Sequence, residues 1–213
     1  MTTIYLIRHS TRINHDYINE YNTTQSELLK SEKDILSVEG EERARILAEQ
    51  KEFKNVDMVY VSNCVRTLQT AKYLVEKYNL KVDIDERLDE RRVGISNSDQ
   101  YPDWFTRQFK DKDYKTINGE SQNDVCLRMN EKINEILEKY NNKNIAIFSH
   151  GYAIMFYLLQ FANLDYIDED RIIKISYNNK ILLDGKINAP EVFKLVFDGK
   201  KLVDIDHIIF KEL

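Results

Sequence analysis

Three short apolar segments, separated from one another by helical patterns, constrain the fold of this 213-residue chain more than any other feature. The segments are residues 3–8, 56–61 and 144–149. In residues 145–148 (IAIF) the apolar run is unbroken, which is typical of a strand buried on both faces. Strands that alternate with helices pair in parallel through right-handed crossovers. The sequence therefore predicts an α/β fold, a three-layer sandwich with a mostly parallel central sheet and helices on both faces.

Helical periodicity predicts three amphipathic helices between these strands. They cover residues 37–53, 65–78 and 121–140. Ser37 is expected to cap the first helix, and Ser121 and Asp124 have the spacing of a capping box at the start of the third. Each helix carries apolar residues that helical spacing places on one side. The stripes are Ala44, Leu47 and Ala48 in the first, Val65, Leu68, Val75 and Tyr78 in the second, and Val125, Met129, Ile133, Ile136 and Tyr140 in the third.

Shorter signals complete the predicted elements. Residues 80–84 read as a brief third strand, a short helix is expected after Pro102, and an apolar helix after Gly151. The C-terminal residues 192–208 predict a hairpin that turns at Asp198-Gly199. With two prolines and six glycines the chain has no linker-like segment, and it shows no internal repeat. We therefore expect one domain over residues 1–213.

The overall charge excludes two classes of partner. The formal net charge is −5 and the sequence pI is about 5.5, whereas general nucleic-acid binders and binders of anionic membranes need a basic face. The longest apolar run, residues 153–162, is too short to span a bilayer. Cys64 and Cys126 belong to no C-x-x-C pair and are expected to be reduced thiols. With no signal peptide before the first strand, these features favour a cytoplasmic protein, and they leave its oligomeric state open.

Charged and imidazole side chains gather where the strands end. Arg8, His9 and Arg12 follow the first strand, and Arg66 follows the second. Glu90 follows the third strand and His150 follows the fourth. Ligands of open α/β sheets bind outside the carboxyl ends of the strands, so we expect these side chains to meet there.

Phosphoryl transfer is the chemistry that this set of residues suits. Arginine forks match phosphate oxygens, and the helix N-termini near Arg66 and Gly151 are expected to add backbone donors. A histidine can act as the nucleophile, and a carboxylate can protonate the leaving alcohol. The four histidines lack the short regular spacing of metal ligands, so no metal site is predicted.

Five short motifs, in order along the chain, carry a resemblance to a known family. Arg8-His9-Ser10 is similar to R-H-G, residues 62–71 (SNCVRTLQTA) to S-P-L-x-R-A-x-Q-T-A, and residues 88–94 (LDERRVG) to L-x-E-R-x-x-G. Residues 119–121 match G-E-S and residues 149–151 match S-H-G. The chain thus resembles the histidine phosphatase superfamily, which includes the cofactor-dependent phosphoglycerate mutases, and it is closest to that mutase-like branch.

The resemblance implies a role for each site residue. His9 would become phosphorylated, Arg8, Arg66 and His150 would hold the phosphoryl group, and Glu90 would donate the proton. Arg12 is similar in position to the second arginine of R-H-G-x-R in the acid phosphatase branch, and we expect it to be a further phosphate ligand or else an exposed loop arginine. Neither a metal ion nor a cofactor is implied.

The predicted activity is a metal-independent phosphatase that hydrolyses a small phosphorylated metabolite. The segment after Glu90 is shorter than in the family's mutases, and residues 90–94 read ERRVG where the mutases have E-R-H-Y-G, which favours a hydrolase. A phosphoglycerate mutase-type phosphomutase and a catalytically silent phospholigand-binding protein remain the alternatives.

Residues 91–118 mix basic and aromatic side chains and allow two interpretations. They form either a surface segment whose aromatic residues pack onto the sheet or a cap that binds the rest of the substrate. His15 and His207 have no evident partners in the sequence, and no role is predicted for them.

Overall fold

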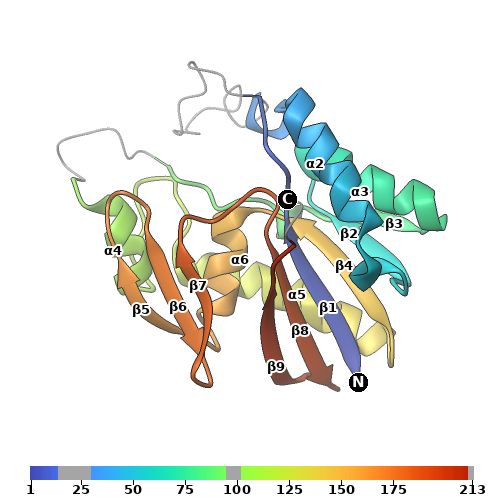
Figure 1. The fold of residues 1–213 in the computed structure, drawn as a ribbon. Coiled ribbons are helices and arrows are strands. Elements are labelled where there is room, and N and C mark those ends of the chain that lie inside the picture. Colours follow the sequence, from blue (N-terminus) through green and yellow to red (C-terminus); the bar gives the residue numbers. More distant parts are fainter. Residues whose placement is uncertain (14–29, 95–101, 211–213) are drawn as a thin grey trace.

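The computed structural model describes residues 1–13, 30–94 and 102–210 and has a six-stranded central sheet in the order β3-β2-β4-β1-β8-β9 (Figure 1). The strands are β1 (Thr2–Arg8), β2 (Met58–Val61), β3 (Val82–Ile84), β4 (Asn144–Ser149), β8 (Val192–Asp198) and β9 (Lys201–Ile208). The first four are parallel to one another, whereas β8 and β9 are antiparallel additions at the β1 edge. The predicted fold class is therefore confirmed.

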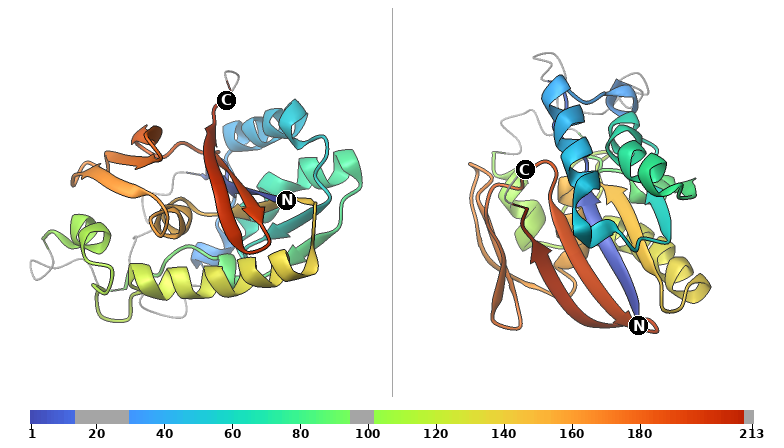
Figure 2. Two further views of the ribbon diagram at one scale, coloured as in Figure 1. Left: turned by 90° about the horizontal axis from the view of Figure 1, so that it is seen from below. Right: turned by 45° about the vertical axis from the view of Figure 1, so that its right-hand side comes forward.

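Helices cover both faces of this sheet (Figure 2). On one face lie α2 (Val38–Glu49) and α3 (Val65–Tyr78), and on the other lie α5 (Gln122–Lys139) and α6 (Gly151–Leu158). Alternate side chains of β1 enter the two cores: Ile4 and Leu6 pack with α5 and α6, whereas Tyr5 and Ile7 pack with α2 and α3. This two-sided burial explains why the strands are continuously apolar.

The pairing of β1 with β4 sets the level at which the two strands end. Arg8 lies opposite Ser149, so His9 and His150 both follow the sheet at the same edge. Val61 of β2 lies opposite Phe148 of β4, which brings the loop before α3 to that edge as well. The strand-end residues singled out in the sequence are therefore neighbours in space.

The helix boundaries agree closely with the periodicity, and the predicted caps are present. Ser37 accepts a hydrogen bond from the Gly40 N–H, and Ser121 and Asp124 form the full capping box. The first helical segment ends as a separate 3₁₀ turn, η1 (Lys51–Phe53). A second 3₁₀ turn, η2 (Glu86–Leu88), and the short helix α4 (Trp104–Lys110) precede α5.

The apolar stripe predicted for α3 lies at the margin of the core and not at its centre. Val65, Leu68, Val75 and Tyr78 are only partly buried, and the fully buried positions are Arg66, Thr67, Thr70, Ala71 and Leu74. Leu68, Val75 and Tyr78 pack against the core from the side, and the centre of the buried face carries an arginine and two threonines that contribute to the site. The hydrogen bond from the Ser10 N–H to Thr70 Oγ1, 2.9 Å long, shows how α3 contacts the β1 loop.

Two strand predictions also need correction. The strand expected over residues 80–84 begins only at Val82, and all three of its residues are exposed because β3 is an edge strand. The C-terminal hairpin turns one residue later than predicted, at Gly199-Lys200, since Asp198 still pairs with Lys201.

A small second sheet, for which the sequence patterns predicted no elements, lies beside α4 (Figure 1). It consists of β5 (Asn163–Ile167), β6 (Ile173–Tyr177) and β7 (Lys180–Gly185), all antiparallel. The β6–β7 turn places Asn178 and Asn179 at φ values of 46° and 65°. Two successive left-handed residues mark a type I′ hairpin turn, so this Asn-Asn pair was the available sequence signal. No helix in the described part of the chain is long and apolar enough to cross a membrane.

Gly40 of α2 provides a test of how the β1 loop packs. An ideal Cβ built on Gly40 would lie 1.8 Å from the Thr11 carbonyl oxygen. Alanine normally stabilises a helix interior relative to glycine by about 1 kcal/mol. Here we expect the opposite sign: Gly40→Ala should lower the free energy of unfolding by about 1 to 3 kcal/mol, as overpacking does. Urea unfolding of this variant beside Glu39→Ala, an exposed position on the same helix, measures the difference; a stabilised Gly40→Ala protein would contradict the packing described.

Candidate active site

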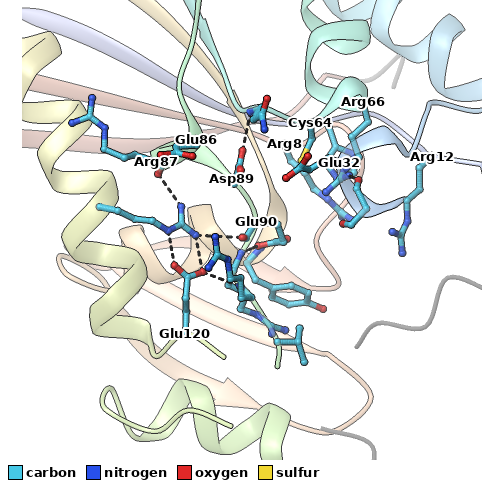
Figure 3. A pocket seen from close by; sticks show the side chains of 18 of the residues that line it. Arg8, Arg12, Glu32, Cys64, Arg66, Glu86, Arg87, Asp89, Glu90 and Glu120 are labelled. Carbon is cyan, nitrogen blue, oxygen red and sulfur yellow. Dashed lines mark hydrogen bonds and ion pairs between the residues drawn. The ribbon is translucent and has the colours of Figure 1, made fainter. Parts of the chain in front are cut away.

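A cavity of about 410 Å³ opens at the carboxyl ends of β1 and β2 (Figure 3). Its wall is unusually rich in charge for a protein of net charge −5, since eight arginines and five acidic residues line it. The arginines are Arg8, Arg12, Arg66, Arg87, Arg91, Arg92, Arg128 and Arg171, and the acidic residues are Glu32, Glu86, Asp89, Glu90 and Glu120. The site therefore favours an anionic ligand.

His9 is held in one tautomer. Its Nδ1 lies 2.7 Å from the Ser10 carbonyl oxygen, and because a carbonyl can only accept, Nδ1 carries the proton. The lone pair is then on Nε2. Burial lowers the pKa of His9 well below its ordinary value, and the charges of Arg66 and Arg8 lower it further. The ring is therefore neutral near pH 7, as a nucleophilic nitrogen must be.

Arg8 is anchored by backbone oxygens from the far end of the chain. Its Nη1 donates to the carbonyls of Ile187 and Asn188, the second at 3.0 Å. Its Nε is buried and has no hydrogen-bond partner among the described residues. A Cβ on Gly151 would lie 3.2 Å from that nitrogen, so the glycine of the S-H-G motif leaves room for the guanidinium.

The loop that anchors Arg8 is in turn fixed by Glu191 and His207. The Asn188 N–H donates to Glu191 Oε2 at 2.6 Å, and Glu191 Oε1 lies 2.5 Å from His207 Nε2. The Glu191 carbonyl also accepts the Arg8 backbone N–H. His207, for which no role was predicted, is thus connected to Arg8 through Glu191. No local sequence signal pointed to this arrangement, because the partners are some 180 residues from Arg8.

His150 contacts Arg66 and lies beside His9. The ring centroids of the two histidines are 5.2 Å apart. Arg66 Nη2 is 3.0 Å from His150 Nδ1, and since arginine only donates, Nε2 must carry the proton that bonds Ser62 Oγ at 2.7 Å. Both ring nitrogens are therefore engaged, and His150 is not among the residues that line the cavity. In this geometry it positions Arg66, and direct phosphate binding by His150 stays a prediction.

Glu90 lies at the start of α6. Its Oε1 accepts the backbone N–H of Ala153 at 2.9 Å, and its Oε2 accepts that of Tyr152 at 3.3 Å. The Glu90 carboxylate therefore occupies two of the backbone donors at this helix N-terminus, and the contribution of the helix to phosphate binding stays a prediction. These bonds hold the carboxylate at the cavity wall, where Figure 3 shows it between Arg8 and Glu120.

Arg12 lines the cavity but is already paired. Its Nη1 lies 3.2 Å from Asp34 Oδ2, and its side chain is 43% exposed, whereas that of Asp34 is fully buried. The two interpretations of Arg12 therefore combine: it is an exposed loop arginine at the cavity, with its charge balanced by Asp34. Its role as a phosphate ligand stays a prediction.

One group of residues in the described chain has metal-ligand composition. The ligating atoms of Cys64, Asp89 and His150 lie within 4.8 Å of one another. Burial raises the pKa of the Cys64 thiol to about 11, and both nitrogens of His150 are engaged. With Arg66 alongside, this group is poorly arranged for a cation. The absence of a resident metal stays a prediction.

The segment after Glu90 forms an arginine–aromatic wall. The Arg91 guanidinium lies over the rings of Tyr152 and Trp104, at 4.5 Å and 5.2 Å from their centroids. Phe105 and Phe109 of α4 are buried in the core, so the packing interpretation holds for that helix. Residues 91–93 line the cavity, as a cap segment would. Residues 95–101 lie outside the described residues, and the cap as a whole stays a prediction.

Several cavity residues were not singled out as site residues in the sequence. Glu120 binds Arg128 through Nε at 2.8 Å and Nη2 at 3.1 Å (Figure 3), and the Arg128 Nη1 reaches the Arg87 carbonyl. The G-E-S motif was the signal for Glu120. Arg171 comes from the turn between β5 and β6, where the sequence patterns had predicted no element, so nothing in the sequence connected it to the site.

Comparisons with known proteins identify the family of the chain. The model of the histidine phosphatase superfamily (branch 1) matches residues 4–180. "Probable phosphoglycerate mutase GpmB" of Serratia proteamaculans is 28% identical over 164 residues, 72% of each chain. "Phosphoserine phosphatase 1" of Hydrogenobacter thermophilus is 27% identical over 124 residues, 54% of this chain. That alignment spans 58% of the relative's own length.

Solved structures show the same fold. A mycobacterial glucosyl-3-phosphoglycerate phosphatase, solved in complex with VO3, superposes with a TM-score of 0.68 at 18% identity and 98% coverage of both chains. YhfR of Bacillus stearothermophilus gives a TM-score of 0.66 at 18% identity, with 95% coverage of both chains. At these identities the likeness establishes the fold alone.

Asp89 yields a prediction for the pH dependence of stability. Burial raises the pKa of Asp89 from 3.8 to about 6, against an opposing hydrogen bond from the Asn63 N–H. The folded protein therefore holds this proton more tightly than the unfolded chain, so stability falls as the pH rises from about 4 to about 6. Asp89→Asn keeps an oxygen for Asn63 and cannot ionise. We expect it to raise the free energy of unfolding by about 1 to 3 kcal/mol at pH 7 and to leave it unchanged near pH 3.5.

Urea unfolding of both proteins at the two pH values measures this difference. A gain of equal size at both values would mean that the substitution acts through packing and that Asp89 is not destabilised by its own charge.

Proposed function

Because the chain belongs to the histidine phosphatase superfamily, branch 1, we propose that it hydrolyses a phosphomonoester of a small metabolite through a phosphohistidine on His9. The observation that carries this proposal is the state of His9: a neutral ring with its lone pair on Nε2, beside the buried Arg66 and the partly buried Arg8. Relatives named as a phosphatase and as phosphoglycerate mutases support phosphoryl transfer as the reaction class.

In the first step His9 Nε2 attacks phosphorus and the ester P–O bond breaks. Arg8 and Arg66 stabilise the negative charge on the phosphoryl oxygens. Each of these arginines has a buried Nε that makes no hydrogen bond to a described residue. The proton that the leaving alcohol needs comes from Glu90, which backbone N–H groups hold at the cavity wall. The products of this step are the free alcohol and phosphohistidine.

In the second step water attacks the phosphohistidine and the P–N bond breaks. Glu90, now ionised, accepts a proton from the attacking water, and inorganic phosphate leaves. The electron pair of the broken P–N bond returns to Nε2, so His9 is again neutral with its proton on Nδ1. His150 takes no part in bond making; it keeps Arg66 in place through Nδ1.

We propose that no metal ion takes part. Arginine side chains supply the positive charge that a metal would otherwise bring to the phosphoryl group. Cys64 and Cys126 are free and buried thiols, which fits the proposal that the protein works in the cytoplasm.

A phosphoglycerate mutase-type reaction is the second candidate, supported by the relatives named for it. A mutase must return the phosphoryl group to an intermediate before water reaches it. Incubation with 3-phosphoglycerate separates the two: a phosphatase releases inorganic phosphate, whereas a mutase yields 2-phosphoglycerate. A silent phospholigand-binding protein would do neither, and would release no phosphate from an aryl phosphate.

The nucleophile is tested by His9→Ala. We expect turnover of p-nitrophenyl phosphate to fall to background, because the substitution removes the only group proposed to attack phosphorus. A substrate labelled with ³²P should leave acid-labile, base-stable label on the wild-type protein and none on the variant. The circular dichroism spectrum of the variant should match that of the wild-type protein, because His9 lies at a strand end.

Two results would contradict this assignment. Label found on His150 would move the nucleophile to the second histidine. Loss of wild-type activity in excess EDTA, restored by a divalent cation, would require a metal mechanism.

Glu90 is tested with two leaving groups. A general acid matters for a poor leaving group such as an alkyl alcohol and little for a stable phenolate. Glu90→Gln should therefore slow hydrolysis of an alkyl phosphate about a hundredfold to ten-thousandfold while slowing p-nitrophenyl phosphate much less. Both rates are measured at one pH, because the ionisation of the phosphate group itself would distort a pH profile.

Equal slowing of both substrates would show that Glu90 acts by positioning or electrostatics alone. Asp89→Asn and Glu120→Gln would then be compared on the same pair of substrates, since both carboxylates line the cavity.

A further inference from the structure

The backbone that carries Glu90 has little regular structure of its own. In residues 87–92, which we name the Glu90 segment, η2 ends at Leu88 and residues 89–92 belong to no helix or strand. Backbone N–H and C=O groups outside helices and sheets need other partners, and side chains from elsewhere in the fold can supply them. The position of Glu90 therefore depends on side chains that reach this backbone from other elements.

Arg128 of α5 binds two carbonyl oxygens of the Glu90 segment. Its Nη1 donates to the Arg87 carbonyl at 2.8 Å, and its Nη2 donates to the Glu90 carbonyl at 3.3 Å. Ser149 of β4 donates to the carbonyl of Leu88, between these two, at 2.7 Å. Side chains from a helix and a strand of the core thus hold three carbonyls at the N-terminal side of the segment.

Glu120 holds both Arg128 and the C-terminal end of the Glu90 segment. Its Oε1 accepts Arg128 Nε at 2.8 Å, and its Oε2 accepts Arg128 Nη2 at 3.1 Å and the backbone N–H of Arg92 at 2.8 Å (Figure 3). The backbone N–H of Glu120 donates to the Arg92 carbonyl at 2.9 Å. Arg92 is therefore fixed through both of its backbone groups, and Glu90 lies between two anchored points.

Arg128 and Glu120 form a mutually neutralising pair that is largely shielded from water. The Arg128 side chain is 17% exposed and that of Glu120 is 19% exposed. A side-on arginine–carboxylate pair has a fixed planar geometry, which a lysine cannot reproduce with its single ammonium group. Each of the three guanidinium nitrogens of Arg128 makes at least one of these bonds. This arrangement suits the support of Glu90 better than it suits direct binding of the substrate.

We propose that Arg128 is a positioning residue for Glu90, and that it holds the proton donor at the cavity wall through the backbone of the Glu90 segment. The inference rests on the proposed function, because it requires Glu90 to be the general acid. The N–H groups of Tyr152 and Ala153 fix the Glu90 carboxylate, and Arg128 fixes the backbone from which that side chain extends. A shift of this backbone would move the proton away from the leaving oxygen and leave Arg8 in place.

The test is Arg128→Lys, which keeps a positive charge opposite Glu120 but cannot bridge two carbonyls as the guanidinium does. Glycerol 3-phosphate and p-nitrophenyl phosphate serve as the alkyl and aryl substrates, and kcat/KM is compared because it reports the steps up to cleavage of the ester bond. We expect kcat/KM for glycerol 3-phosphate to fall about tenfold to a hundredfold, as it does when a reacting group is slightly misplaced. The value for p-nitrophenyl phosphate should fall less than about threefold, since its leaving group needs little protonation.

Two further measurements separate positioning from substrate binding. The inhibition constant of inorganic phosphate should be the same for Arg128→Lys and the wild-type protein, because the groups proposed to bind phosphate are unchanged. The double variant Glu90→Gln, Arg128→Lys should be no slower on glycerol 3-phosphate than Glu90→Gln alone, because both substitutions act through the same carboxyl group.

A second variant and a control complete the set. Glu120→Gln disturbs the same pair from its other side and should show the same dependence on the leaving group, so it carries the test if urea unfolding shows that Arg128→Lys does not fold. Arg45→Lys is the control, because Arg45 makes a two-bond pair with Glu42 on α2 and does not line the cavity. It should change kcat/KM for neither substrate.

The outcomes separate this inference from the proposed function. Equal losses on both substrates would overturn the positioning role, and a raised inhibition constant for phosphate would make Arg128 a phosphate ligand instead. Unchanged rates in Arg128→Lys, or losses that add in the double variant, would also overturn it, while a selective effect of Glu90→Gln would leave the proposed function standing. Equal slowing of both substrates by Glu90→Gln would remove the proton donor of the proposed function, and this inference with it.

Discussion

The placement of two arginine side chains beside a buried histidine is the constraint on which the rest of the site depends. Burial lowers the pKa of His9, and the charges of Arg66 and Arg8 lower it further, so the ring is neutral and available as a nucleophile. The folded protein stabilises these cations with neutral acceptors, such as the backbone oxygens around Arg8 and the Nδ1 of His150 next to Arg66. Carbonyl oxygens and an imidazole offset the cost of burial without cancelling the positive charge, which leaves both arginines able to attract a phosphoryl group.

The need for neutral acceptors around Arg8 explains why the C-terminal hairpin belongs to the site. The family model ends at residue 180, yet the acceptors for Arg8 are the carbonyls of Ile187 and Asn188. Glu191 fixes that loop, and His207 of β9 fixes Glu191. The antiparallel pairing of β8 with β1 brings the loop to the end of β1, so an addition at the sheet edge completes the anchoring of a residue at its centre.

The cavity divides into two parts with different origins. The parallel core of the sheet supplies the phosphoryl side, where the first strand, the α3 N-terminus and the S-H-G turn meet. The outer side is built from the segment after Glu90 and from the β5–β6 turn. The family motifs describe the inner part and reach the outer part through residues 88–94 and 119–121, whereas Arg171 of the β5–β6 turn lies outside them.

The sequence by itself determined the order of strands and helices, the helix caps and the identity of His9, Arg8, Arg66 and Glu90 as strand-end residues, because these follow from local periodicity and short motifs. Apolar periodicity located only the margin of the buried face of α3, whose centre carries Arg66 and two threonines, and it predicted no elements for the small sheet. Only the tertiary structure decided that His150 engages Arg66, that Glu90 occupies the start of α6, and that Glu191, His207 and Arg171 join the site. Those contacts join residues that are far apart in the chain. A local sequence pattern cannot predict them, because the partners meet only when tertiary contacts such as the pairing of β1 with β4 and β8 have formed.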